Sequence, residues 1–473
     1  MAATTSHVER LGDFVARARF EDIPATIVEK AKRHILDTLG AGLAGATSDE
    51  SAHVCAMLEA CGEGGPAVIW GKEKRAAARA AALANGVAAH AFELDDTGGC
   101  DHSGAVVLPA AMSALCQCRD AVSGADLIKA VVLGYDLGRR VMEALGGYEP
   151  HNAAGWHSTG TCGTFASAAG VASLLRLDAR QCTSAIALAA SFSSGLWAFI
   201  HDGSQAKRMH AGRAAEGGLL AALLAREGVT GPVRVFDDVW GGFLRAFAHE
   251  PTDVDALIRD LGSTWKMESA AIKPYASCRG THSAVDAVGK ILSTPGVSVE
   301  SLSELRVRLS PFLHDMCGGR DLSLMPAAQM SLPYAVAARM TFGTAGLSAY
   351  AEKRRADAAV QAAMAKIVLA TDDSMAASDE PYLTAVLLDG RRIDERVTVA
   401  LGAPANPLND EGLLAKFNEL AGLVLDAGRI RELADAVLTL EREPDARSLS
   451  ARLAPGAARE LSKRYLSVAA QAN

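Results

Sequence analysis

Three histidines stand in similar surroundings, each beside a run of small residues that predicts the start of a helix. The three segments are Asp101-His102-Ser103-Gly104, Trp156-His157-Ser158-Thr159-Gly160 and Gly280-Thr281-His282-Ser283. A helix N-terminus carries a partial positive charge, so it attracts carboxylates and disfavours the protonated form of a nearby imidazole. Because neutral histidine is the form that accepts a proton, the repeated pattern predicts a site for proton transfer.

Basic residues gather in the segment 205–213, which has the spacing of a helix. Lys207 and His210 lie three residues apart and fall on nearly the same face, with Arg213 one further step around the helix. Alanine and glycine surround them, so neighbouring backbones can approach and bury part of this face. A buried cation needs an anionic partner. That partner is either a substrate carboxylate, which we favour, or Glu216.

A further basic segment combines Lys273, Pro274 and Tyr275 with Arg279, shortly before His282. Pro274 favours an extended backbone at Lys273. Arg279 and the N–H groups of the turn that follows are suited to hold a carboxylate. The alternative is a structural helix cap with Tyr275 packed beside it.

The segment 93–102 collects four carboxylates around two glycines. The carboxylates are Glu93, Asp95, Asp96 and Asp101. Such a segment is either an acid–base loop or a hydrated surface turn. A divalent metal site is disfavoured, because the spacing matches no specific ligand motif. His157 also has a plainer alternative, a buried and hydrogen-bonded structural histidine.

Composition limits the class of protein. The chain has 473 residues and a net charge of −8, which argues against a general nucleic-acid surface. No uninterrupted apolar run approaches membrane-spanning length, and the N-terminus lacks the pattern of a signal peptide. The nine cysteines form no C-x-x-C pair, so we expect reduced, mostly buried thiols in a cytoplasmic protein.

Helical patterns rich in alanine and glycine dominate the chain from about residue 5 to 265. One amphipathic pattern, 27–39, is followed by Gly40, Gly42 and Gly45, which predict a break. Strand patterns follow at 304–310, 366–370 and 382–392, the last joined to 395–400 through an Asp-Gly turn. Helical patterns lie between these strands and return at 410–427. The chain is therefore predicted to leave a helical domain and later re-enter it.

Six groups of residues occur in order between residues 37 and 407. They are Asp37-Thr38-Leu39-Gly40; Asp95-Asp96-Thr97 with 102–109; Gly155-Trp156-His157; Lys207-Arg208-Met209-His210-Ala211-Gly212; Lys273-Pro274-Tyr275 with Arg279-Gly280-Thr281-His282; and Asn406-Pro407. Together they resemble the MmgE/PrpD family, which includes 2-methylcitrate dehydratase, cis-aconitate decarboxylase and iminodisuccinate epimerase.

The resemblance implies a mainly α fold. A large all-helical domain, residues 1–268 with 403–473, would carry an inserted α+β lid domain, residues 269–402. It also implies a homodimer and an active site between the domains, with neither a metal ion nor an organic cofactor. The expected substrate is a small di- or tricarboxylate.

The family's functional positions carry over to seven residues of this sequence. They are Asp95, Asp96, His102, His157, Lys207, Lys273 and His282. By resemblance, the lysines hold substrate carboxylates, while the histidines and acidic residues move protons. Arg208, His210, Tyr275 and Arg279 are the further candidates for substrate binding.

Two departures from the family bear on the substrate. Citrate-type members commonly have a histidine or a bulky residue directly after Asp-Asp-Thr, where this chain has Gly98 and Gly99. The lid commonly carries a basic residue where this chain has Gln329. One candidate leaving-group acid and one carboxylate-binding charge are thus missing, which favours a substrate other than a tricarboxylate.

The shared chemistry is removal of a proton beside a carboxylate, with fixed cations stabilising the charge that develops. Loss of a leaving group makes the enzyme a lyase, either a dehydratase or a decarboxylase, which we favour. Return of the proton to the opposite face makes it an epimerase, the alternative that the two departures support. The third hypothesis is a non-catalytic helical dimer that binds a small acid or another protein.

Overall fold

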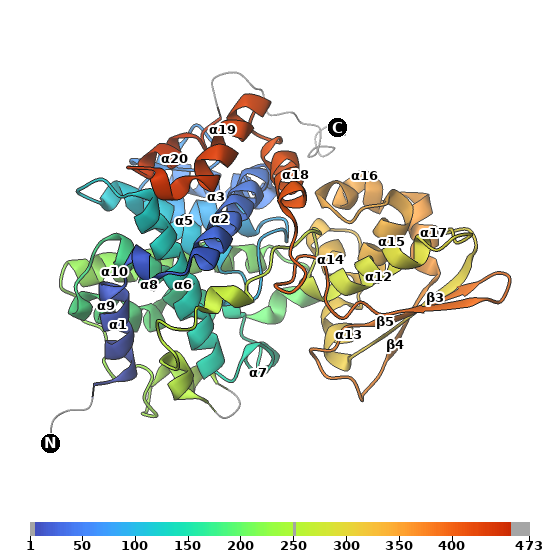
Figure 1. Cartoon of the computed structure of the whole chain (residues 1–473), viewed down its shortest axis with the longest axis horizontal. Helices are drawn as coiled ribbons and strands as arrows, with labels where there is room; N and C mark the ends of the chain where they lie inside the picture. Colours follow the sequence, from blue (N-terminus) through green and yellow to red (C-terminus); the bar gives the residue numbers. More distant parts are fainter. Residues whose placement is uncertain (1–4, 249–251, 456–473) are drawn as a thin grey trace.

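The computed structural model describes residues 5–248 and 252–455, and most of this part is helical. Figure 1 shows two lobes, a large helical one and a smaller one that contains the main sheet. The large lobe begins with α1 (His7–Arg17), α2 (Ala25–Gly45), α3 (Asp49–Ala60), α4 (Ala78–His90), α5 (Gly104–Ala114), α6 (Gly124–Ala144), α7 (Tyr148–Ala153), α8 (Ser158–Leu174), α9 (Ala179–Ala189), α10 (Ala206–Arg226) and α11 (Phe243–Phe247). Strands β1 (Ala67–Val68) and β2 (Arg75–Ala76) form a short antiparallel pair within it.

Helix α8 is the centre of the large lobe. Every one of its residues is buried, and it packs against α5, α6, α9 and α10. Its sequence is rich in glycine, alanine, serine and threonine, whose small side chains let the surrounding helices approach closely. The residue directly before it is His157, so a predicted site residue caps the central helix.

The predicted break at Gly40, Gly42 and Gly45 is wrong, because α2 continues through to Gly45. These glycines provide close packing instead. A Cβ atom at Gly42 would lie 2.5 Å from the Trp70 ring, and one at Gly45 would lie 1.8 Å from the Ala88 carbonyl oxygen. Both distances are shorter than van der Waals contact allows, so the absence of a side chain sets the spacing of α2 from its neighbours.

The smaller lobe contains a four-stranded sheet with helices packed on it (Figure 1). The strands are β3 (Leu302–Leu309), β4 (Ile367–Thr371), β5 (Tyr382–Leu387) and β6 (Arg392–Glu395), in the order β4-β3-β5-β6. Strand β3 pairs in parallel with β4 and antiparallel with β5. The helices of this lobe are α12 (His282–Leu292), α13 (Pro311–Cys317), α14 (Met325–Gln329), α15 (Leu332–Phe342), α16 (Glu352–Arg355) and α17 (Ala358–Ala365).

The strand predictions are confirmed at three of four places. Patterns 304–310 and 366–370 become β3 and β4, and the Asp-Gly turn after β5 contains Gly390 with a φ of 85°. The fourth strand was predicted at 395–400, which is wrong, since β6 ends at Glu395. Because the turn is tight, the residues shortly after Gly390 already pair with β5. Strand β6 therefore lies nearer to the turn than the predicted strand.

The chain returns to the large lobe through α18 (Asp410–Ala421), α19 (Ala427–Leu438) and α20 (Arg447–Ala451). Helices α18 and α19 pack on α2. The Nζ atom of Lys416 in α18 lies 2.6 Å from a carboxylate oxygen of Asp37 and 2.6 Å from the Leu94 carbonyl oxygen. In the part of 403–473 that the structure describes, which ends at residue 455, the chain thus packs against the large lobe.

Two stretches of chain cross between the lobes side by side. The backbone N–H of Ile272, on the outgoing stretch, donates to the carbonyl oxygen of Gly402 on the returning one at 3.1 Å. Thr97 and Ala271 form an antiparallel bridge that joins the outgoing stretch to the acidic loop 93–102. The core of the smaller lobe also includes apolar residues of α2 and Phe92, so the two lobes share buried surface.

Two expectations from composition concern the whole chain. Within residues 5–248 and 252–455, no helix combines the length and apolar character needed to cross a bilayer. All nine cysteines lie in this part, and each is free. Only Cys61 is exposed, and the rest are buried or half-buried.

Candidate active site

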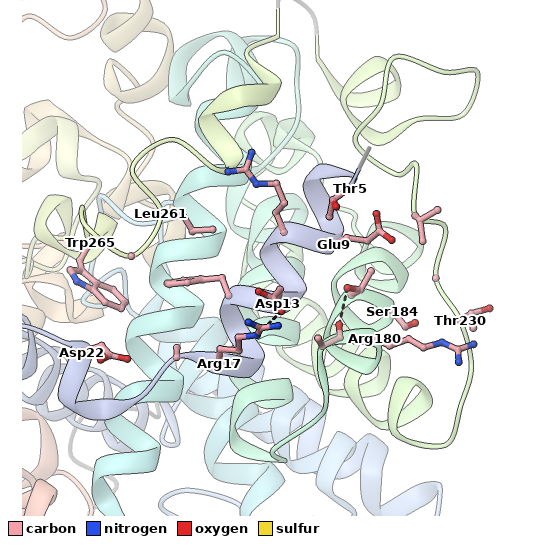
Figure 2. A pocket seen from close by; sticks show the side chains of 18 residues that line it. Thr5, Glu9, Asp13, Arg17, Asp22, Arg180, Ser184, Thr230, Leu261 and Trp265 are labelled. Carbon is pink, nitrogen blue, oxygen red and sulfur yellow. Dashed lines mark hydrogen bonds and ion pairs between the residues drawn. The ribbon is translucent and has the colours of Figure 1, made fainter. Parts of the chain in front are cut away.

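A large hollow lies against α1 and α9 and has a volume of about 1230 Å³ (Figure 2). Its charged side chains are open to solvent. Arg17 and Asp13, for example, pair at 2.7 Å with 78% and 45% of their side chains exposed. Water screens such pairs, and none of the predicted site residues lines this hollow. Size alone therefore does not mark the functional site.

A second cavity, of 450 Å³, is lined by residues of both lobes. Four predicted site residues face it: His102 and Lys207 from the large lobe, Lys273 from the outgoing stretch and Arg279 from the smaller lobe. The acidic loop contributes Glu93 and Asp101. A pocket that brings buried ionisable side chains together between two lobes is the preferred setting for catalysis.

Glu93 is the centre of charge in this cavity. Its carboxylate, 1% exposed, forms ion pairs with Lys207 and Arg208, and it lies 3.1 Å from the Nζ atom of Lys273. Burial opposes the charge, but Lys207, Lys273 and Arg208 outweigh it and hold the pKa of Glu93 well below its usual range. Of the two partners weighed for Lys207, Glu216 is excluded, because it pairs with Arg213 on the exposed face of α10. Three cations therefore surround this one buried carboxylate.

Asp95 and Asp96 have different surroundings, although they are adjacent. One carboxylate oxygen of Asp95 lies 2.8 Å from Nδ1 of His90 and 3.0 Å from Nδ1 of His102. Asp96 points away from both histidines. It accepts from the Gly104 N–H at the start of α5 at 2.9 Å and also bonds to Tyr135. Asp95 therefore positions His102, whereas Asp96 caps a helix.

His102 is the imidazole on the cavity wall. Its Nδ1 atom lies 2.8 Å from the Asp96 carbonyl oxygen, and its Nε2 atom lies 3.5 Å from a carboxylate oxygen of Asp101. Burial disfavours its charged form, but Asp101 and Asp95 outweigh burial and raise the pKa of His102. The two carboxylates next to the ring thus favour the protonated form of His102, in the opposite direction to the effect expected of a helix N-terminus.

His157 lies behind Asp101, fully buried at the start of α8. Its Nδ1 atom lies 3.0 Å from Nδ1 of His210, and its Nε2 atom lies 3.9 Å from the Asp101 carboxylate. Burial, with Lys207 next in effect, lowers the pKa of His157 well below its usual range. For His157, burial therefore favours the neutral form that the sequence predicts.

His282 and Tyr275 lie away from the cavity, against each other in the smaller lobe. His282 faces the Ser277 carbonyl oxygen, with its Nε2 atom at 3.2 Å, and burial lowers its pKa well below the usual range. Tyr275 donates its hydroxyl proton to Asp286 at 2.5 Å. For Tyr275 this geometry matches the plainer alternative, packing beside a structural turn.

The remaining basic candidates are held by acidic or amide partners. Arg208 also donates to the amide oxygen of Gln329 at 3.1 Å, and Gln329 donates to the Phe92 carbonyl oxygen at 2.7 Å. Gln329 therefore fixes a cation of the cluster, at the position where the family commonly has a basic residue. Arg279 lies at the cavity rim and pairs with Glu380 at 2.7 Å.

The structure adds three residues that the sequence prediction did not select: Glu93, Asp101 and His90. Glu93 and Asp101 have positive φ values, 55° and 93°, which residues other than glycine rarely adopt. Such backbone strain is often found at functional sites, but it cannot be seen in a sequence. The sequence signal for Glu93 and Asp101 is the acidic loop 93–102 itself, from which the family resemblance implies only Asp95 and Asp96.

The large lobe and the smaller lobe each match a known domain. Residues 9–254 match the MmgE/PrpD N-terminal domain, and residues 275–442 match the MmgE/PrpD C-terminal domain. The chain belongs to the MmgE/PrpD family. These matches cover most of the sequence, so the family resemblance stated from short motifs is confirmed.

Among the family's characterised members, the chain is similar to proteins named for one reaction. It is 29% identical to the cis-aconitate decarboxylase-like protein oryM of Aspergillus oryzae, over 93% of this chain and 96% of that protein. It is 29% identical to the cis-aconitate decarboxylase of Aspergillus terreus, over 90% of this chain and 91% of that enzyme. The human cis-aconitate decarboxylase is 26% identical, over 90% of each chain. All three relatives align over nearly their full length.

Proposed function

We propose that this MmgE/PrpD protein is a lyase that decarboxylates a small unsaturated tricarboxylate of the cis-aconitate type. This proposal goes against the expectation from the two sequence departures, which favours a substrate other than a tricarboxylate. In this proposal, side chains of the protein transfer the proton, and the reaction needs neither a metal ion nor an organic cofactor. One observation carries the proposal. The cavity between the lobes is lined by the His102 imidazole, which contacts Asp95 and Asp101, and by the Lys207 and Lys273 cations. The names of the relatives support the same reaction.

The chemistry of cis-aconitate defines what the site must supply. One of its three carboxylates sits on a methylene next to the double bond. When this group leaves as carbon dioxide, the electrons of the breaking carbon–carbon bond form a new double bond to the central carbon. The old double bond opens, and its outer carbon takes up one proton. Each turnover therefore consumes one proton and requires an acid near that carbon.

His102 is the proposed acid, since it is the imidazole that faces the cavity. Lys207 and Lys273 are proposed to hold the two carboxylates that stay on the product. Both ammonium groups are buried and already fixed by Glu93, so little reorganisation is needed when substrate binds. Asp95 fixes the orientation of His102 from the side away from the cavity.

The remaining family expectations are also proposals. We propose that residues 269–402 form an inserted lid over a helical domain made of 1–268 and 403–473. The paired crossing stretches at Ile272 and Gly402 support this division, because both connections lie at one place. We further propose a homodimer located in the cytoplasm.

The alternative reactions fit the geometry less well. A two-base epimerase needs one protonated and one unprotonated carrier on opposite faces of the reacting carbon, whereas nearby carboxylates raise the pKa of both His102 and Lys273 and so favour the protonated form of each. Burial disfavours the charge of Lys273, but Glu93 and Asp95 outweigh it and raise its pKa, so this lysine stays protonated. A dehydratase needs an acid for the leaving hydroxide, and Gly98 offers no side chain. A side chain at Gly98 is excluded, since its Cβ would lie 2.2 Å from the Ser269 carbonyl oxygen.

Incubation with four separate acids tests the proposal: cis-aconitate, citrate, 2-methylcitrate and iminodisuccinate, followed by proton NMR and by release of carbon dioxide. We expect carbon dioxide and a five-carbon dicarboxylate from cis-aconitate. Loss of water from 2-methylcitrate, or inversion of iminodisuccinate, in the absence of decarboxylation would overturn it. Absence of any turnover by folded protein would favour the binding hypothesis.

A further inference from the structure

Three buried histidines meet behind the wall of the cavity. His90, His102 and His157 each present one ring nitrogen, and these three atoms lie within 4.8 Å of one another. The residues come from different segments: the last position of α4, the loop before α5 and the N-cap of α8. Helix packing rather than sequence spacing brings them together, which explains why no ligand motif is visible in the sequence.

Two of the three rings have a free buried nitrogen. The Nε2 atoms of His90 and His157 have no hydrogen-bond partner among the described residues. Both side chains are 0% exposed. A buried polar atom without a partner costs about 1–3 kcal/mol, so native structures retain few of them without a reason. A bound cation between the rings would provide the missing partner for both atoms.

The opposite side of each ring is already held. Nδ1 of His90 and Nδ1 of His102 share one oxygen of Asp95, at 2.8 and 3.0 Å. Nδ1 of His157 lies 3.0 Å from His210. In metal sites a carboxylate commonly holds the far nitrogen of a ligating histidine in this way, which fixes the tautomer and aims the other nitrogen at the metal.

We propose that His90, His102 and His157 form a binding site for a divalent transition metal of the zinc class, with Asp101 available as a fourth donor. Three imidazoles with one further position is a common coordination for zinc. The Asp101 carboxylate lies 3.5 Å from Nε2 of His102 and 3.9 Å from Nε2 of His157. Imidazole nitrogen favours zinc, copper, nickel and cobalt over magnesium and calcium, which prefer oxygen.

The site needs only small movements to close around an ion. Zinc–nitrogen bonds of about 2.1 Å in a tetrahedron place neighbouring nitrogens about 3.4 Å apart. The three ligand atoms lie within 4.8 Å of one another, so each pair must approach by at most about 1.4 Å to close around an ion. The ammonium groups of Lys207 and Lys273 are held by Glu93, so they do not occupy the space between the three histidine rings.

An ion at this position engages the imidazole that we propose as the acid. Metal binding and proton transfer by His102 then exclude each other, so the ion acts as an inhibitor. The binding part stands independently, whereas the inhibition part rests on the proposed function. The following experiment therefore measures binding without substrate.

Metal-stripped protein is titrated with Zn²⁺, with Co²⁺ as a spectroscopic probe and Mg²⁺ as a hard-cation comparison. We expect one Zn²⁺ per chain, a tetrahedral cobalt absorption spectrum and no comparable Mg²⁺ binding. His90→Asn keeps a donor for Asp95 but removes the ligating nitrogen, and it should weaken Zn²⁺ binding at least tenfold. His314→Asn, at a half-exposed histidine outside the cluster, is the matched control and should bind as the wild type does.

X-ray absorption of the zinc-loaded wild type tests the ligand set without any substitution. We expect three imidazole nitrogens at about 2.0–2.1 Å. The proposal is overturned if no stoichiometric zinc is bound, if fewer than three imidazoles are counted, or if folded His90→Asn binds zinc as tightly as His314→Asn does. If zinc binds as expected but decarboxylation is unaffected, the inhibition part alone is wrong.

Discussion

At the scale of single residues, the site is organised by one carboxylate and one imidazole. Glu93 forms ion pairs with Lys207, Arg208 and Lys273. His102 lines the same cavity. Neither arrangement depends on solvent-exposed ion pairs, which contribute little to the stability of a protein. The charges are desolvated, so each has a large effect on its neighbours.

His102→Asn removes the proposed acid while keeping a polar side chain of similar size. We expect kcat to fall by about 10²–10⁴-fold, the usual contribution of general acid–base catalysis. The measurement is the initial rate of carbon dioxide release, with His314→Asn as a control expected to match the wild type. A decrease of less than about tenfold in folded His102→Asn would assign the proton transfer to another group.

Glu93→Gln leaves three buried cations around a neutral amide. We expect the free energy of unfolding at pH 7 to fall by about 3 kcal/mol, as when one partner of a buried ion pair is removed. Because the pKa of Glu93 is lowered in the folded state, its contribution is complete above the ordinary value of 4.5 and is lost as the pH falls through the folded pKa. The difference from wild type should therefore shrink below about pH 4.

Denaturant unfolding at several pH values measures this difference. Glu216→Gln is the matched control, since Glu216 pairs with the exposed Arg213 and should contribute less than about 1 kcal/mol. Equal losses for the two variants, or a Glu93→Gln loss that persists unchanged at acid pH, would show that Glu93 is not the buried counter-ion described.

At the scale of elements, the site depends on helix ends and crossing stretches. The start of α8 carries His157, the start of α10 carries Lys207, and the outgoing stretch between the lobes carries Lys273. The type and approximate position of most helices and strands could be predicted, because hydrophobic periodicity reports which face is buried. Which elements meet could not be predicted, since that depends on packing between distant segments.

The histidine cluster illustrates this limit. His90 ends α4 and was read as part of a helical pattern, because its sequence neighbours are alanines with no chemical signal. The glycines of α2 show the opposite error, in which a local rule predicted a break that close packing against Trp70 and Ala88 overrides. Asp95 and Asp96 look equivalent in sequence and differ only in which side of the loop they face.

Gly402→Ala tests the crossing between the lobes. The φ of Gly402 is +89°, and a Cβ there would lie 2.0 Å from the Ile272 carbonyl oxygen. Gly390→Ala is the control, because Gly390 has a φ of +85° but open space around its Cβ position. We expect Gly390→Ala to cost about 1 kcal/mol from backbone strain and Gly402→Ala about 2 kcal/mol more. Equal losses in denaturant unfolding would refute a tight crossing.

At the scale of the whole molecule, the two lobes act as one unit around the cavity. The core of the smaller lobe extends onto α2, and Lys416 of α18 joins Asp37 to the acidic loop. A rearrangement of either lobe therefore changes the position of the site residues. The proposed division into a helical domain and a lid is consistent with this geometry, and the family resemblance adds the expectation of a homodimer.

Light scattering of the purified protein tests the dimer. We expect a mass of about 98 kDa, twice the 49.2 kDa of one chain, that persists on dilution through the micromolar range. A mass of one chain at these concentrations, with decarboxylation retained, would show that the dimer is not needed for the reaction.

The central claim is that the site couples loss of carbon dioxide to delivery of one proton. Its most direct test is the reaction of cis-aconitate in deuterated water, followed by carbon-13 and proton NMR. We predict one deuterium per product molecule, on the carbon that was the outer carbon of the old double bond, and none on the new terminal methylene. Deuterium on the terminal methylene, or exchange into cis-aconitate in the absence of carbon dioxide release, would contradict the account.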